Sequence, residues 1–172
     1  MARGPSSVNR RVEIVSAAIE VFAEIGYYRA TTAQVAERAA ISQPYVYRFF
    51  TKESLLVESL NVSWQRILQA FQQVIESAAP EELETGLIRA YEGIMHSHRS
   101  EILLQMQAQT IQDTSIRAAM QQGMNQVKEQ VENAFRNAGI KNAEERTSVF
   151  LARGMLCNVA MAMDMPNLMP KK

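Results

Sequence analysis

The sequence of 172 residues contains a single cysteine, Cys157, and only two histidines, His96 and His98. One cysteine excludes a disulfide framework within the chain and is typical of a cytoplasmic protein. The chain has no run of about 18 apolar residues, so no membrane span is predicted. Its first residues lack the apolar stretch of a secretory signal. We therefore expect a cytoplasmic protein that has no membrane partner.

Motifs that would indicate an enzyme are also missing. The sequence has no glycine-rich phosphate loop and no nucleophile elbow. His96 and His98 are two positions apart, so on a helix they point in nearly opposite directions and cannot clamp one metal ion. Cys157 lies in an apolar helical stretch, which predicts a buried and inert thiol. We expect no catalytic residue, no metal site and no cofactor.

The net charge is zero, with 18 basic and 18 acidic residues, but the charges are unevenly distributed. Residues 1–52 contain seven basic and four acidic residues, a balance of +3. Residues 53–172 contain eleven basic and fourteen acidic residues, a balance of −3. A basic head on an acidic body is typical of a phosphate-binding module joined to a domain that does not bind nucleic acid.

The pattern of apolar residues is helical along the whole chain. These residues recur at spacings of three and four, and neither an alternating strand pattern nor a tight hairpin turn occurs. In the first helix the expected buried stripe is Val12, Val15, Ile19, Phe22 and Ile25. The fold class is therefore all-α, with helices predicted over roughly residues 9–25, 31–39, 43–50, 52–77, 81–98, 101–112, 114–137 and 143–165.

Capping residues mark the ends of two short helices near the N-terminus. Thr31 and Gln34 have the spacing of a capping box, and Ser42 can cap the following helix. Pro44 fits the first turn of that helix, where a missing N–H costs nothing. Two short helices joined by a tight turn and braced by a longer helix form a helix-turn-helix. The same spacing, at Asn142 and Glu145, predicts a capping box at the start of the last helix.

The second short helix indicates DNA binding. At about 100° per residue, Val46, Phe49 and Phe50 fall on one side and must face the core. In a major groove, glutamine can bond adenine, arginine can bond guanine or phosphate, tyrosine hydroxyls can reach phosphate, and apolar rings can touch thymine methyls. The alternative is that the tyrosines pack on neighbouring helices. The outward side carries all of these groups: Gln43, Pro44, Tyr45, Tyr47 and Arg48.

Residues 11–56 contain, in this order, Gly26-Tyr27, Thr31-Thr32, Val35-Ala36, Ala39, Ile41-Ser42, Tyr47, Phe50, Lys52-Glu53 and Leu55-Leu56. With these residues, the segment resembles the DNA-binding domain of the TetR family of transcriptional repressors. The resemblance implies that the helix at 43–50 enters the major groove, and that Thr32, Tyr47 and Lys52 contact the phosphate backbone. It also implies that Gln43, Pro44, Tyr45 and Arg48 approach the bases, and Thr31 and Ser42 complete the predicted DNA-binding set.

Two positions depart from the family pattern. The family usually has glycine in the turn where this chain has Ala40, and a positive φ there would cost an alanine about 1 kcal/mol. The family usually has two residues between the phenylalanine and the lysine that follow the helix, whereas only Thr51 separates Phe50 from Lys52. This shorter link changes the aim of Lys52.

The last two predicted helices are the candidate dimer interface. The resemblance implies a four-helix bundle to which each subunit contributes two helices. A homodimer is also expected from the helix-turn-helix itself. One two-turn helix contacts too few base pairs, whereas two copies can read a palindromic operator. The alternative is that these residues only complete the core of one subunit. The expected interface residues are Val127, Val131, Ala152, Met155, Leu156, Val159 and Met163.

Ten methionines are many for a chain of this length. Methionine adapts to irregular apolar ligands, and the resemblance implies an effector cavity among the middle helices. We expect a mostly apolar pocket for a hydrophobic organic ligand. Filling of an ordinary core is an equally good explanation of the methionines. The candidate ligand-binding residues are Trp64, Tyr91, Met95, Met106, Gln107, Met120 and Met124.

The sequence thus predicts a helix-turn-helix DNA-binding domain over residues 1–52 and a helical effector-binding and dimerisation domain over residues 53–172. The expected function is that of a repressor, released from a palindromic operator by a small hydrophobic ligand. The competing class is a helical adaptor that binds only protein through the tyrosine-rich face. Phosphate contacts would make DNA affinity fall steeply with salt, which separates the two classes.

Overall fold

The fold is that of a computed structural model, which describes residues 7–168. Over these residues the chain forms eight α-helices and two 3₁₀ turns and contains no strand, so the all-α prediction is confirmed. The elements are α1 (Ser7–Ile25), α2 (Thr32–Arg38), α3 (Gln43–Tyr47), α4 (Lys52–Ser77), η1 (Pro80–Glu82), α5 (Leu83–Ser97), α6 (Arg99–Ala108), α7 (Thr114–Asn137), α8 (Ala143–Ala162) and η2 (Pro166–Leu168).

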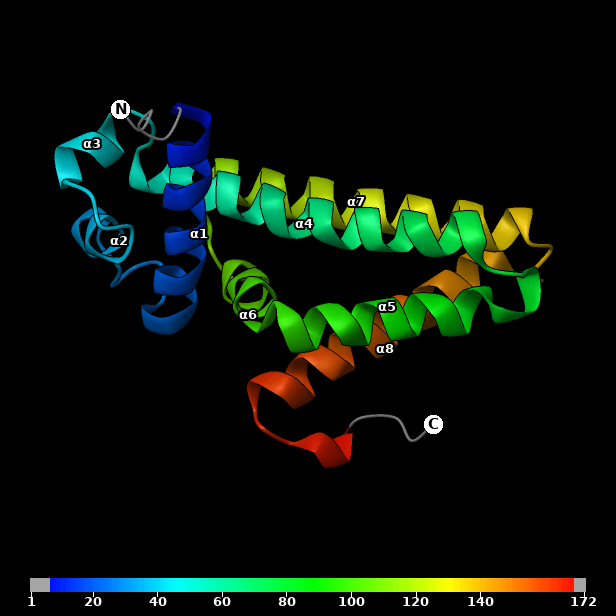
Figure 1. The fold of residues 1–172 in the computed structure, drawn as a ribbon. Coiled ribbons are helices and arrows are strands. Elements are labelled where there is room, and N and C mark those ends of the chain that lie inside the picture. Colours follow the sequence, from blue (N-terminus) through cyan, green and yellow to red (C-terminus); the bar gives the residue numbers. More distant parts are fainter. Residues whose placement is uncertain (1–6, 169–172) are drawn as a thin grey trace.

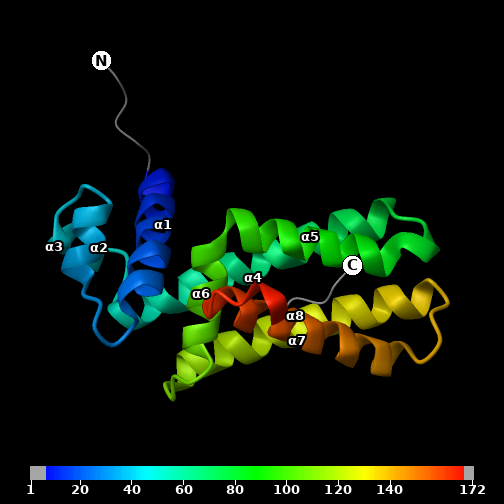
Figure 2. The ribbon, with the colours of Figure 1, turned by 90° about the horizontal axis from the view of Figure 1, so that it is seen from below.

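The helices are arranged as a small head at one end of a longer helical body (Figure 1). The head is formed by α1, α2 and α3. The body begins with α4, which leaves the head and runs alongside α7, while α5 and α8 lie on the other side of the body. Seen from below, α6 crosses between the head and the body and packs against α1 (Figure 2). A change in the body can therefore reach the head through two connections, α4 and α6.

Local capping explains why several helix limits were predictable. The Thr51 side chain accepts from the backbone of Ser54, so α4 begins at Lys52 as expected. Asp113 accepts from the backbone N–H groups of Ser115 and Ile116 and starts α7 at the predicted residue. The capping box predicted at Asn142 and Glu145 is wrong. Asn142 is left-handed, with φ 54°, and makes no side-chain cap, because capping requires an extended backbone there.

The buried face of α1 is rotated slightly from the predicted one. Val15, Ile19 and Phe22 are buried as expected, but Val12 is 64% exposed. Ile14 is fully buried instead, because α1 packs against α2, α4 and α6 together and so buries a wider face than one stripe.

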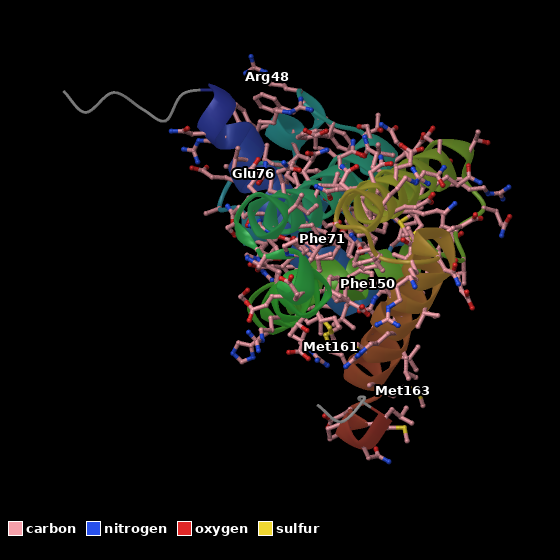
Figure 3. All side chains as sticks on the ribbon, turned by 90° about the vertical axis from the view of Figure 1, so that its right-hand side faces the viewer. Arg48, Phe71, Glu76, Phe150, Met161 and Met163 are labelled. Atoms are coloured by element: carbon pink, nitrogen blue, oxygen red, sulfur yellow. The ribbon has the colours of Figure 1, made fainter. Side chains whose placement is uncertain are left out.

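The centre of the body is a cluster of aromatic rings that joins three helices. The Phe71 ring of α4 meets the Phe150 ring of α8 edge-on at 5.8 Å, and Phe150 meets Phe135 of α7 at 6.0 Å. In Figure 3, Phe71 and Phe150 point toward each other between the helices. Burying such a ring contributes about 1.5–3 kcal/mol each. None of the helices in residues 7–168 is long and apolar enough to cross a membrane.

Candidate nucleic-acid interface and effector cavity

The turn between α2 and α3 has a left-handed residue although the chain has alanine and not glycine at this position. Ala40 has φ 53°, in the left-handed region, where an alanine is strained. The N–H of Ile41 donates to the carbonyl of Ala36 (3.0 Å), which closes α2 and directs the chain into α3. Thr31 caps α2 in the predicted box with Gln34. Two short helices are thereby fixed in a helix-turn-helix arrangement.

The inward and outward faces of α3 follow the prediction. Val46 and Phe50 are buried, at 0% and 4% exposure, whereas Tyr47 is 57% exposed. Pro44 and Arg48 are also exposed. The helix itself is shorter than expected, because it ends at Tyr47 and Arg48 forms its C-cap. The exposed side chains nevertheless project into solvent on one side of the head.

A hydrogen-bonded cluster orders three polar side chains at this surface. The Thr32 hydroxyl of α2 donates to the Tyr47 hydroxyl (2.8 Å), and Gln43 Nε2 donates to Thr32 Oγ1 (2.9 Å). Thr32 is only 4% exposed, so the direct phosphate contact expected of its side chain is not supported. Its hydroxyl is bonded to the side chains of both Tyr47 and Gln43.

Arg48 is held by an aromatic ring rather than by a carboxylate. Its guanidinium carbon lies 5.5 Å from the centre of the Tyr45 ring, and Tyr45 is in turn edge-on to Phe49 at 5.3 Å. In Figure 3, Arg48 projects from the outer edge of the head, away from the body. Tyr45 is half-buried and supports Arg48. The two alternatives for this tyrosine, packing on neighbouring residues and display on the outward face, therefore each hold in part.

Lys52 and Ser42 lie at the two ends of this surface. Lys52 Nζ donates to the carbonyl of Tyr28 (3.3 Å) and lies 4.7 Å from the centre of the Tyr27 ring. The short link after Phe50 thus directs Lys52 toward the α1–α2 turn. Ser42 is exposed and its side chain makes no cap hydrogen bond, so the cap predicted for it is wrong and its hydroxyl is available.

Ion pairing separates the basic residues of the head into two groups. Arg10, Arg11 and Arg38 each contact a glutamate, and Arg38 bridges Glu20 and Glu24 at 2.8 Å. Hydrogen bonding from Arg38 lowers the pKa of the Glu24 carboxyl below its ordinary value. In the described part of the head, Arg29, Arg48 and Lys52 have no carboxylate partner. Their positive charge is available for an anionic ligand.

The body contains an apolar cavity between α4, α5, α6, α7 and α8. Trp64, Tyr91, Met95, Met120 and Met124 line it, as predicted from the sequence. The cavity volume is about 70 Å³, smaller than the roughly 300–1,000 Å³ of a typical ligand pocket. A ligand of ordinary size therefore requires side chains to move.

Besides Tyr91, this cavity has polar groups from Asn158 and Gln105, which the sequence did not single out. The Tyr91 hydroxyl donates to Asn158 Oδ1 (2.9 Å), and Gln105 Nε2 donates to Ser63 Oγ (2.9 Å). Burial raises the pKa of Tyr91 to about 12, so its phenol is neutral. Asn158 and Gln105 are 5% and 4% exposed. An amide within an apolar helical face was the signal that could have identified them.

Two of the predicted cavity residues lie elsewhere. Met106 and Gln107 do not line the cavity, because the rotation of α6 is set by its packing on α1. Gln107 Nε2 donates to the carbonyl of Ala23 near the end of α1 (2.9 Å). Gln107 thus connects the body to the head. The thiol of Cys157 is buried and its pKa is raised by burial, in agreement with the inert thiol expected.

The residues of the expected dimer interface differ in their exposure between α7 and α8. Val127 and Val131 are 4% and 0% exposed, so they belong to the core of the subunit and cannot contact a partner. On α8, Leu156 and Met163 are 42% and 61% exposed. Figure 3 shows Met163 on the side away from the aromatic core. The remaining predicted residues, exposed or half-buried on the same helix, are Ala152, Met155 and Val159.

Comparison with known proteins points to one family. Residues 14–59 match the family model described as bacterial regulatory proteins, tetR family. The chain is 31% identical over 108 residues to the HTH-type transcriptional repressor KstR2 of Mycolicibacterium smegmatis, covering 61% of this chain and 53% of the relative. It is 34% identical over 89 residues to the HTH-type transcriptional regulator HbdR of Aromatoleum sp., covering 51% of this chain and 35% of the relative. The chain thus spans about half or less of these relatives.

Solved structures show the same fold. A TetR-like transcriptional regulator from Rhodococcus sp. RHA1 has a TM-score of 0.77 at 18% identity and covers 95% of this chain and 88% of its own. The regulator FadR from Bacillus subtilis, solved in complex with stearoyl-CoA, has a TM-score of 0.75 at 17% identity. The match covers 89% of this chain and 87% of the FadR chain. The similarity extends over head and body alike.

Proposed function

We propose that this chain, whose residues 14–59 match the tetR family model, is a DNA-binding transcriptional regulator that represses its targets. Its heads would bind a palindromic operator as a homodimer, and a small hydrophobic ligand would release them. It would act in the cytoplasm, where its DNA lies, and it would not be an enzyme. Repression is the function named for the KstR2 relative.

The observation that carries this proposal is the outward face of α3. Gln43 and Tyr47 are ordered by hydrogen bonds to Thr32, and Arg48 is exposed without a carboxylate partner. Amide and guanidinium groups can read base edges in the major groove, and a tyrosine hydroxyl can reach phosphate. Preorganised side chains lose less conformational entropy on binding. The face is therefore suited to the major groove.

The homodimer would form through α8. Val149, Leu156 and Met163 are large apolar residues exposed on this helix, and small Ala152 lies between them. Exposed apolar residues in one row favour a protein partner over water. A twofold pair would present two copies of α3 about 34 Å apart, which matches successive major grooves on one side of DNA.

The ligand would bind in the methionine-lined cavity and act on the head through α6. Gln105 lines the cavity and bonds Ser63, and two residues later Gln107 bonds the carbonyl of Ala23 in α1. A ligand that needs a wider cavity would favour a state in which α6 is shifted and the two heads no longer fit DNA. Because the B. subtilis neighbour binds stearoyl-CoA, an acyl chain is the first ligand to test.

Selection of bound fragments from random DNA tests the proposal. We expect a palindromic motif and an affinity that falls steeply with salt. Arg48→Ala is expected to weaken binding to the selected site by about 1–3 kcal/mol if Arg48 reads a base. Arg89→Ala, which removes an exposed arginine of α5, is the matched control and should change nothing. Failure to select any motif, or equal losses in the two variants, would contradict the proposal.

A further inference from the structure

The indole N–H of Trp64 is buried without a hydrogen-bond partner. Trp64 is 5% exposed and lines the cavity. Indole nitrogen is a donor only, so nothing but an acceptor can satisfy it. Buried donors in folded proteins are nearly always paired, and leaving one unpaired costs about 1–3 kcal/mol. The cavity is therefore lined by a residue whose buried N–H group lacks an acceptor.

The position of this indole is set by the backbone of α7. Gly123 faces the ring, and a Cβ there would lie 2.2–2.4 Å from three indole atoms. The absence of a side chain at Gly123 lets α7 approach the face of the indole closely. The ring is thus packed between helices and is not free to turn its N–H toward water.

Among the described residues, no acceptor lies within bonding distance of this donor. The Tyr91 hydroxyl and the Asn158 carbonyl oxygen bond each other, and the Ser63 hydroxyl is engaged with Gln105 and with the carbonyl of Leu60. No methionine sulfur of the cavity is within bonding distance of the indole N–H. An acceptor group on a bound molecule would therefore satisfy this donor.

We propose that the cavity binds a largely apolar ligand whose carbonyl oxygen, as in a ketone, ester or thioester, accepts a hydrogen bond from Trp64. The proposal rests on the proposed function, which places the effector in this cavity. Room for the ligand comes from Met95, Met120 and Met124, whose unbranched side chains change conformation easily.

The ligand can extend beyond the cavity. Met120, Met124 and Gln109 line both the cavity and an adjoining open groove, which also includes Arg117 and Gln121. The cavity lining is mainly apolar, whereas the groove combines apolar and polar side chains. A chain bound in the cavity can thus continue toward solvent between α6 and α7.

Nuclear magnetic resonance of the wild-type protein tests the proposal, because Trp64 is the only tryptophan and gives one indole N–H signal. The probes are dodecane and the 2-, 4- and 6-isomers of dodecanone, and methionine methyl signals report binding of each. We expect at least one ketone to move the indole proton downfield, as a new hydrogen bond does, and dodecane to leave it near its original position. Shifts of the methionine signals by all probes, with no ketone-specific shift of the indole, would overturn the inference and leave the effector cavity intact. No shift of any signal would count against both.

Affinities provide the second measurement. We expect the best ketone to bind about ten-fold more tightly than dodecane, as restoring one buried hydrogen bond implies. Trp64→Phe should reduce this ratio to about one. Gly93→Ala is the control, because its added methyl group meets no atom, and it should keep the ratio. A ratio that survives in Trp64→Phe would overturn the inference, and if that variant does not fold, the indole shift in the wild type decides.

Discussion

Replacing Ala40 by glycine should stabilise the protein. Ala40 has φ 53°, and a left-handed conformation costs a non-glycine residue about 1–2 kcal/mol. Glycine avoids this cost but makes the unfolded chain more flexible, which costs about 0.4–1 kcal/mol. The difference predicts that Ala40→Gly raises the free energy of unfolding by about 0.5–1 kcal/mol.

The neighbouring Ala39 supplies the control. It has φ −83°, an ordinary value, so Ala39→Gly gains nothing in the folded state and loses about 0.5–1 kcal/mol to chain entropy. Urea unfolding followed by circular dichroism measures both variants against the wild type. The two substitutions should move the midpoint in opposite directions. Equal destabilisation by both would refute the reasoning from backbone strain, because it would show that the turn tolerates alanine without cost.

Three further predictions concern the body. Gly123→Ala should destabilise the protein by about 1–3 kcal/mol and change the fluorescence of Trp64, because the added methyl group overlaps the indole, whereas Gly93→Ala meets no atom and should not destabilise it. Leu156→Glu should shift sedimentation from dimer to monomer while circular dichroism stays unchanged, and an intact dimer would count against the α8 interface. Tyr91 has its pKa raised to about 12, so only the unfolded state loses this proton just above pH 10. Its contribution to stability is present below pH 10 and falls as the pH rises toward 12, and the difference in unfolding free energy between wild type and Tyr91→Phe should shrink over that range.

Local signals made much of the fold predictable. Helix α4 follows Thr51, a capping residue, and α7 stops before Gly139, whose φ of 72° suits glycine. The outward display of Arg48 and Tyr47 followed from helical periodicity, because three apolar neighbours fixed which side faced the core. These features depend on residues within a turn or two of each other.

Features that depend on contacts distant in the sequence were not predictable. Periodicity showed that Val127 and Val131 are buried but not whether the subunit or a partner buries them. The rotation of α6, and with it the place of Gln107, is set by packing on α1. The inward position of Thr32 required knowledge of Tyr47 and Gln43 on the next helix. In each case the residue pattern of one helix shows which face is buried but not which neighbouring helix or subunit buries it.

Methylation interference on the selected operator tests most directly whether a symmetric pair of α3 helices reads the major groove. Methyl groups at guanine N7 lie in that groove and block a helix from entering it. Two patches of interference are expected, about one helical turn apart and related by the twofold axis of the site. A single patch, or full binding to DNA methylated at every guanine of the site, would contradict the account.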